Sequence, residues 1–197
     1  DNIRSFDEFD FKIPKSLDGV LRNYQKEGFR WIKALNKNGF GGILADDMGL
    51  GKSVQVISFI LSEMEDAKKD ENKRTLIVCP ASLVYNWKSE FEKFAPDLNV
   101  IMIVGTAENR RKVVADAKKQ DILVTSYDLL KRDIEYYDNI EFFCQIIDEA
   151  QYIKNSGTQA AKAVKLINSG FRVALTGTPV ENRLSELWSE FDYLMPG

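Results

Sequence analysis

A glycine-rich turn followed by lysine and serine is the segment of this sequence best suited to chemistry. Residues 45–53 read ADDMGLGKS, after an apolar run at 42–45 and before apolar residues at helical spacing. A strand, a glycine loop and a helix in this order predict a phosphate-binding loop, in which Lys52 contacts the outer phosphates and the Ser53 hydroxyl binds Mg²⁺. The strict pattern has glycine where this chain has Asp46, and a glycine turn before a surface lysine is the alternative interpretation.

Two adjacent carboxylates, Asp148 and Glu149, follow a predicted strand at 143–147. An acid at a strand tip can hold Mg²⁺ opposite a phosphate loop, directly or through water, and Asp148 fits this role. The neighbouring Glu149 can orient or deprotonate an attacking water. Such acids also occur as plain helix caps, but their position after the glycine loop favours a nucleotide site.

Gln25, upstream of the glycine loop, is a candidate for reading the base. Its amide can accept a hydrogen bond from adenine N6 and donate one to N7, whereas guanine presents two acceptors there. A glutamine exposed on the surface of a helix is the alternative.

Composition excludes several classes of function. The 197 residues fit one domain with 44% hydrophobic and 29% charged residues, and no apolar stretch approaches the roughly 18 residues of a membrane span. The chain has no histidine, which makes zinc hydrolysis and Ser-His or Cys-His catalysis poor candidates. The net charge of −3 argues against a strongly basic nucleic-acid module, although a local basic groove stays open. Cys79 and Cys144 are predicted to be buried, reduced thiols.

Short apolar strands alternate with amphipathic helices, which predicts a parallel sheet covered on both faces. Ligands bind such folds at the carboxyl ends of the strands. Strands are predicted at 42–45, 75–79, 100–104, 122–125, 142–147 and 172–175. Helices are predicted at 21–37, at 52–65, from an N-cap at Ser82 to near Pro96, at 107–119, from a capping box at 156–159, and after Asn182. The charged run at 65–74 is predicted to be a solvated loop without a site.

The motifs in this order resemble the first, N-terminal RecA-like lobe of the Swi/Snf family, superfamily-two ATPases that translocate on double-stranded DNA and remodel protein–DNA complexes. The matching segments are the Q motif at 21–28 and motifs I at 46–53, Ia at 76–87, Ib at 122–130, II at 146–155 and III at 174–182. The resemblance covers residues 17–197. It implies an α/β, three-layer P-loop NTPase fold, with residues 1–20 as a leader segment and the second lobe absent from this chain. The start at Asp1, without Met, indicates an excised or processed chain.

The resemblance also implies roles by position. ATP-binding residues would be Tyr24, Gln25, Asp47, Met48, Gly49, Leu50, Gly51, Lys52 and Ser53, with Ser53 and Asp148 at Mg²⁺ and with Lys52, Asp148 and Glu149 catalytic. Residues for DNA binding and coupling would be Pro80, Ala81, Ser82, Thr125, Ser126, Tyr127, Gln151, Thr176, Gly177 and Thr178. Gln151, where many relatives have histidine, favours a prokaryotic member.

The expected protein is a monomer that uses ATP and Mg²⁺, contacts the phosphate backbone of double-stranded DNA, and works with a second RecA-like lobe of the same polypeptide. It would not be a membrane protein, and would be cytoplasmic and nucleoid-associated in a prokaryote or nuclear in a eukaryote. The isolated lobe is expected to bind ATP weakly and to turn it over slowly. A strand-separating helicase lobe, a non-catalytic ATP-dependent scaffold and a small-molecule kinase are the alternatives.

Two further groups of residues have competing interpretations. Trp31, Trp87 and Trp188 have helical spacing among apolar residues, which favours core packing over base stacking. The basic residues at 110–112 can contact DNA or form a solvated helix face.

Overall fold

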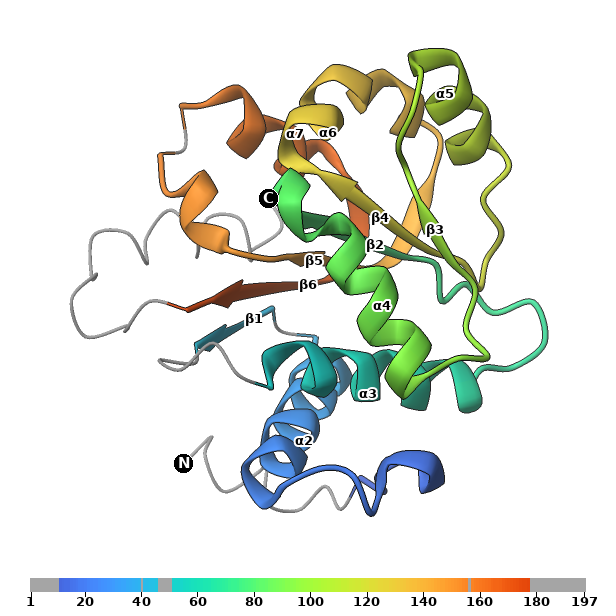
Figure 1. The fold of residues 1–197 in the computed structure, drawn as a ribbon, viewed down its shortest axis with the longest axis vertical. Helices are drawn as coiled ribbons and strands as arrows, with labels where there is room; N and C mark the ends of the chain where they lie inside the picture. The colour runs from blue at the N-terminus through green and yellow to red at the C-terminus, as the bar shows by residue number, and fades with distance from the viewer. Residues whose placement is uncertain (1–10, 40, 46–50, 156, 178–197) are drawn as a thin grey trace.

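Six parallel strands form one central sheet (Figure 1). The computed structural model describes residues 11–39, 41–45, 51–155 and 157–177. The strands are β1 (Gly42–Ala45), β2 (Thr75–Cys79), β3 (Val100–Met102), β4 (Ile122–Ser126), β5 (Glu141–Ile147) and β6 (Asn168–Thr176), in the spatial order β1-β6-β5-β2-β4-β3. Every neighbouring pair is parallel, so the predicted parallel sheet is confirmed.

The register of the sheet brings the ends of four strands to one edge. Val78 of β2 pairs with Thr125 of β4 on one side and with Ile147 of β5 on the other. Ile147 in turn pairs with Ala174 of β6. The segments that leave these strands, each of which carries one of the sequence motifs, therefore begin side by side at the carboxyl edge.

Helices cover both faces of the sheet and complete three layers (Figure 1). The helices α2 (Asn23–Lys37), α3 (Lys52–Glu65) and α4 (Val84–Phe94) pack on one face, and α5 (Ala107–Ala115), α6 (Tyr127–Asp133) and α7 (Gln159–Leu166) lie on the other. Short 3-10 segments are η1 (Lys15–Leu17), η2 (Ala81–Leu83), η3 (Ile134–Tyr137) and η4 (Ala150–Ile153). Side chains of β2 pack into the hydrophobic cores on both faces of the sheet. Ile77 and Cys79 belong to the core under α2, α3 and α4, and Leu76 and Val78 to the core under α5, α6 and α7.

The starts of two helices differ from the sequence prediction. Ser82 does not cap α4, because Ala81–Leu83 form a 3-10 turn and Leu83 precedes the helix without a side-chain cap. Thr158 caps α7, since its hydroxyl accepts a hydrogen bond from the Ala161 N–H at 3.2 Å. Ser156 and the predicted last helix after Asn182 lie outside the described residues.

Other boundaries differ as well. Helix α5 ends at Ala115, short of residue 119, and β6 begins at Asn168, ahead of residue 172. The helix α6 and the segment η3 lie where the apolar periodicity indicates no element. Ser126 caps the N-terminus of α6, because its hydroxyl accepts a hydrogen bond from the Leu129 N–H at 3.1 Å.

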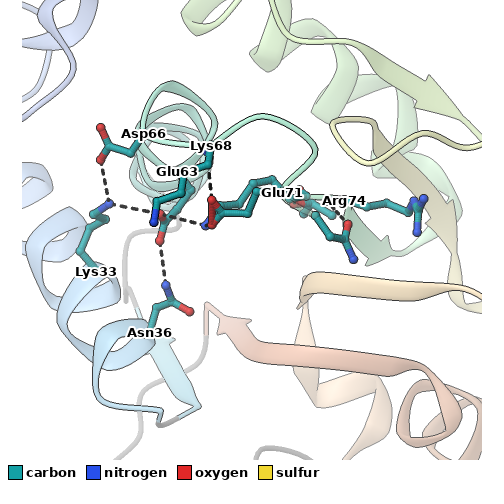
Figure 2. Close-up of polar contacts among 10 residues, drawn as sticks. Lys33, Asn36, Glu63, Asp66, Lys68, Glu71 and Arg74 are labelled. Carbon is teal, nitrogen blue, oxygen red and sulfur yellow. Dashed lines mark hydrogen bonds and ion pairs between the residues drawn. The ribbon is translucent and has the colours of Figure 1, made fainter.

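A buried charged cluster ties the carboxyl ends of α2 and α3 to the segment before β2 (Figure 2). The Glu63 carboxylate lies 3.5 Å from the ammonium groups of both Lys33 and Lys73, and accepts a hydrogen bond from the Asn36 amide at 2.7 Å. The prediction that the charged run at 65–74 is solvated is therefore wrong at Lys73, which is buried against the equally buried Glu63. The cluster holds together the two helices whose amino ends carry Gln25 and Lys52.

Arg110 is also not part of a solvated face. Its guanidinium is buried and forms two hydrogen bonds with the Asp133 carboxylate, at 2.7 and 2.9 Å. It therefore joins α5 to α6 and does not present its charge to solvent.

Cys79 and Cys144 are buried and form no disulfide, as predicted. Burial raises the pKa of the Cys79 thiol to about 12, so it stays protonated at neutral pH. Within the described part of the chain, no helix is both long and apolar enough to cross a bilayer.

Candidate nucleotide-binding site

A cleft of about 160 Å³ lies at the carboxyl edge of the sheet. Its lining comes from four segments: Lys52 and Ser53 at the start of α3, Leu83, Asn86 and Trp87 around the start of α4, Asp148 and Glu149 after β5, and Leu175 of β6. The lysine and serine of the predicted phosphate loop therefore line the same cleft as the two carboxylates. The first N–H groups of α3 have no partner within the helix, and its dipole adds positive charge at this end.

Gly51 begins α3 in a conformation suited to glycine. Its φ of 87° and ψ of 1° lie in the left-handed region. A Cβ atom at this position would lie 2.4 Å from Gln25 Nε2 and 3.0 Å from Tyr24 Oη. Gln25, predicted to contact the base, and Tyr24, predicted to bind ATP, therefore lie directly against Gly51.

Gln25 also has a structural role. Its Oε1 accepts a hydrogen bond from the Arg22 N–H at 2.9 Å and so caps the start of α2. An amide oxygen has two lone pairs, so Oε1 can still accept a hydrogen bond from a base, and Nε2 stays a donor. Tyr24, next to Gln25 in sequence, is 47% exposed and is therefore accessible to a base as well.

Gly51→Ala is expected to weaken nucleotide binding, because the added methyl group displaces Gln25 and Tyr24 and strains the backbone. The strain alone is worth about 1–2 kcal/mol. Gly39→Ala is the matched control, since Gly39 has a φ of 76° and a Cβ atom there meets nothing within 4 Å. Calorimetric titration with ATP and Mg²⁺ should give weaker binding for the Gly51 variant, and equal affinities would contradict this assignment.

The Asp148 carboxylate is held by two hydrogen bonds. Its Oδ2 accepts from the indole Nε1 of Trp87 and its Oδ1 from the Glu149 N–H, both at 2.9 Å. Burial raises the pKa of Asp148, while the Trp87 hydrogen bond and the nearby Lys52 charge act in the opposite direction.

Glu149 has a left-handed backbone, with φ 51° and ψ 54°, which is uncommon for a residue other than glycine. Its carboxylate accepts a hydrogen bond from the Gln151 amide nitrogen. The Gln151 amide oxygen in turn accepts one from the Thr176 hydroxyl at 3.3 Å. These contacts connect motif II to motif III.

The residues predicted to contact DNA separate into two groups. Ala81 and Ser82 are exposed and Pro80 is half-buried, so the turn after β2 is accessible. Thr125, Ser126 and Tyr127 are buried, and the structure does not bring their side chains to the surface. The reason is local: the Ser126 hydroxyl caps α6, and the Tyr127 hydroxyl donates a hydrogen bond to the Asp148 carbonyl oxygen at 2.6 Å.

Other predicted site residues are accounted for as follows. Gly177 follows β6 and is half-buried, whereas Asp47, Met48, Gly49, Leu50 and Thr178 lie outside the described residues. Trp87 is buried and Trp31 packs against the core, as predicted, and Trp188 is outside the described residues.

The contact of Trp87 with Asp148 has a partial signal in the sequence. Trp87 follows Leu83 by four residues and thus shares its helix face, next to a strand tip. Asn86, Leu83 and Leu175, which also line the cleft, carry no such signal.

The donor set fits Mg²⁺. Among the described residues no group of three or more Asp, Glu, His or Cys side chains forms a metal cage. Ser53 and Asp148 instead line one cleft together with Lys52. Mg²⁺ usually takes one or two protein oxygens and completes its shell with water and substrate phosphates, which this arrangement allows.

The fold and the cleft define the class of the protein, a RecA-like P-loop domain. The chain belongs to the family of SNF2-related domains, whose profile matches residues 24–197. It is 46% identical over 194 residues to an ATP-dependent helicase of Mycoplasma genitalium and 42% identical over 196 residues to a TATA-binding protein-associated factor of Saccharomyces cerevisiae. These alignments cover 98% and 95% of this chain but only 18% and 10% of the relatives.

A solved structure supports the same relationship. The SWI2/SNF2 ATPase core of Sulfolobus solfataricus in complex with double-stranded DNA superposes with a TM-score of 0.82 at 41% sequence identity. The match covers 96% of this chain and 38% of that core.

Proposed function

We propose that this chain is the ATP-binding lobe of a double-stranded-DNA-dependent ATPase that translocates on DNA and remodels protein–DNA complexes. The observation that carries the proposal is the meeting of Lys52 and Ser53 with Asp148 and Glu149 in one cleft. A phosphate anchor and a water-activating acid in the same cleft are the groups that phosphoanhydride hydrolysis requires at least.

In the proposed reaction, Gln25 and Tyr24 hold the adenine and the start of α3 holds the phosphates. Ser53 and Asp148 would hold Mg²⁺, which when bound supplies positive charge to the phosphate oxygens. Glu149 orients a water and takes its proton as the water oxygen attacks the γ-phosphorus and the bond to the β,γ-bridging oxygen breaks. The Lys52 ammonium stabilises the negative charge that develops on the phosphate oxygens.

One hydrogen bond and the local backbone conformation hold the Glu149 carboxylate in a defined position. Gln151 holds the carboxylate from one side, and the left-handed backbone at Glu149 sets its direction. A hydrolase needs a positioned carboxylate to take a proton from water, whereas a scaffold that only binds ATP has no use for one. The fixed Glu149 carboxylate therefore favours a hydrolase.

DNA is proposed as the partner because the matched Sulfolobus core is bound to double-stranded DNA. The accessible turn at Ala81 and Ser82 adjoins the cleft through Leu83. Contacts there would go to phosphates and carry little sequence preference.

A second lobe is proposed to complete the site. In comparable NTPases an arginine from a neighbouring lobe or protein is worth about 10³–10⁵-fold in rate. We therefore propose that these residues alone bind ATP weakly and turn it over slowly.

The test compares ATP hydrolysis by the protein at its natural length with and without double-stranded DNA. DNA is expected to stimulate hydrolysis, and its affinity is expected to fall between about 50 and 200 mM salt because phosphate contacts release counterions. Triplex displacement should report translocation. Salt-independent DNA binding or ATP binding without turnover would overturn the proposal, and strand separation would assign a helicase.

A further inference from the structure

Asp148 receives hydrogen bonds from two segments that are distant in sequence. The Trp87 indole of α4 donates to its carboxylate at 2.9 Å, and the Tyr127 hydroxyl at the start of α6 donates to its carbonyl oxygen at 2.6 Å. One donor comes from each face of the sheet, because α4 and α6 lie in opposite helix layers. Asp148 is therefore held from both sides.

The strand register explains why the three residues meet. Asp148 follows β5, and its N–H donates to the Val78 carbonyl of β2 at 2.7 Å. Val78 pairs with Thr125 of β4, two residues before Tyr127. The turn after β2 leads within a few residues into the helix that carries Trp87.

Both donors are packed so that they move with their segments. Trp87 is 3% exposed and its ring lies 6.2 Å from that of Phe91. Tyr127 is 4% exposed and stacks on Tyr152, with ring centroids 5.4 Å apart and an interplanar angle of 1°. A shift of either segment thus changes the surroundings of Asp148.

We propose that Trp87 and Tyr127 are positioning residues that join Asp148 to the segments after β2 and β4, and that DNA contact at the accessible turn after β2 thereby sets the geometry of Asp148. This inference rests on the proposed function and deepens it, because it names the route by which DNA regulates hydrolysis. DNA on the exposed Ala81–Ser82 turn acts through Trp87, and a shift of the β4–α6 junction acts through Tyr127. Both changes act on one residue, Asp148: Trp87 on its carboxylate and Tyr127 on its backbone carbonyl.

The experiment measures DNA-stimulated and basal ATP hydrolysis of Trp87→Phe and Tyr127→Phe in the protein at its natural length. Each substitution removes the donor and retains an aromatic ring. Trp31→Phe and Tyr137→Phe are matched controls, since neither Trp31 nor Tyr137 belongs to this hydrogen-bond set. Affinities for DNA and for ATP with Mg²⁺, and the unfolding temperature, are measured in parallel.

The ratio of stimulated to basal rate is expected to fall at least fivefold in both site variants, within the roughly 5–150-fold range of site-to-site coupling. The controls should keep the ratio, and DNA affinity should change less than twofold. A merely structural role would lower the unfolding temperature without changing this ratio.

The double variant gives a second readout. Its loss of stimulation should be smaller than the product of the single losses, because both donors act on Asp148. The inference would be overturned if Tyr127→Phe kept full DNA stimulation and Trp87→Phe did the same. It would also be overturned if Tyr127→Phe kept full stimulation and Trp87→Phe failed to fold. Absence of DNA stimulation in the unmodified protein would instead refute the proposed function itself.

Discussion

Glu149→Gln is expected to reduce ATP turnover by about 10²–10⁴-fold, the usual contribution of a positioned general base. The amide has nearly the same shape as the carboxylate, and its oxygen can still accept the hydrogen bond from Gln151. It cannot take a proton from the attacking water. The variant should therefore bind ATP and retain it, which single-turnover hydrolysis and nucleotide binding together would measure.

Thr176→Val is the control for the surrounding hydrogen bonds. It removes the hydroxyl that donates to Gln151 and leaves the Glu149 carboxylate in place. Its effect on turnover should be much smaller than that of Glu149→Gln. Unchanged hydrolysis in the Glu149 variant would show that another group activates the water.

Asp133→Ala is expected to lower the free energy of unfolding by about 3–5 kcal/mol, because it leaves a buried guanidinium without its counter-charge. Asp133 is 1% exposed and accepts both hydrogen bonds from Arg110. The Arg110 Nη1 would keep only its hydrogen bond to the Gly105 carbonyl, at 2.6 Å. Urea denaturation followed by circular dichroism measures the loss.

The matched control is Asp128→Ala on the same helix. Asp128 pairs with Lys131 at 3.3 Å, but the Asp128 side chain is 73% exposed, so its loss should cost less than about 1 kcal/mol. Replacing both Arg110 and Asp133 with apolar residues should recover much of the stability, because no lone buried charge remains. Equal costs at Asp133 and Asp128 would contradict a structural role for the buried pair.

Much of the fold follows from local patterns. A parallel strand covered on both faces must be apolar throughout, so the run at Thr75–Cys79 predicts β2 directly. The glycine loop and the acid pair each follow a strand, and the rule that ligands bind at the carboxyl edge then places them together. The cleft that contains Lys52 and Asp148 is the result expected from that rule.

Other features depend on partners that sequence spacing does not reveal. Lys73 lies in a charged run that looks solvated, but Glu63 of the preceding helix supplies its counter-charge in a buried position. Arg110 is recognised as structural only when Asp133 is known to lie against it. Likewise, an apolar helix stripe predicts that Trp87 is buried, but its hydrogen bond to Asp148 depends on the position of α4 relative to the end of β5.

A crystal structure of the Glu149→Gln protein with ATP and Mg²⁺ tests the central claim most directly, since slow turnover preserves the bound triphosphate. We expect the γ-phosphate between Lys52 and residue 149, the metal between Ser53 and Asp148, and the adenine against Gln25. A triphosphate bound elsewhere, or one in contact with Lys52 but with the metal remote from Asp148, would contradict this claim.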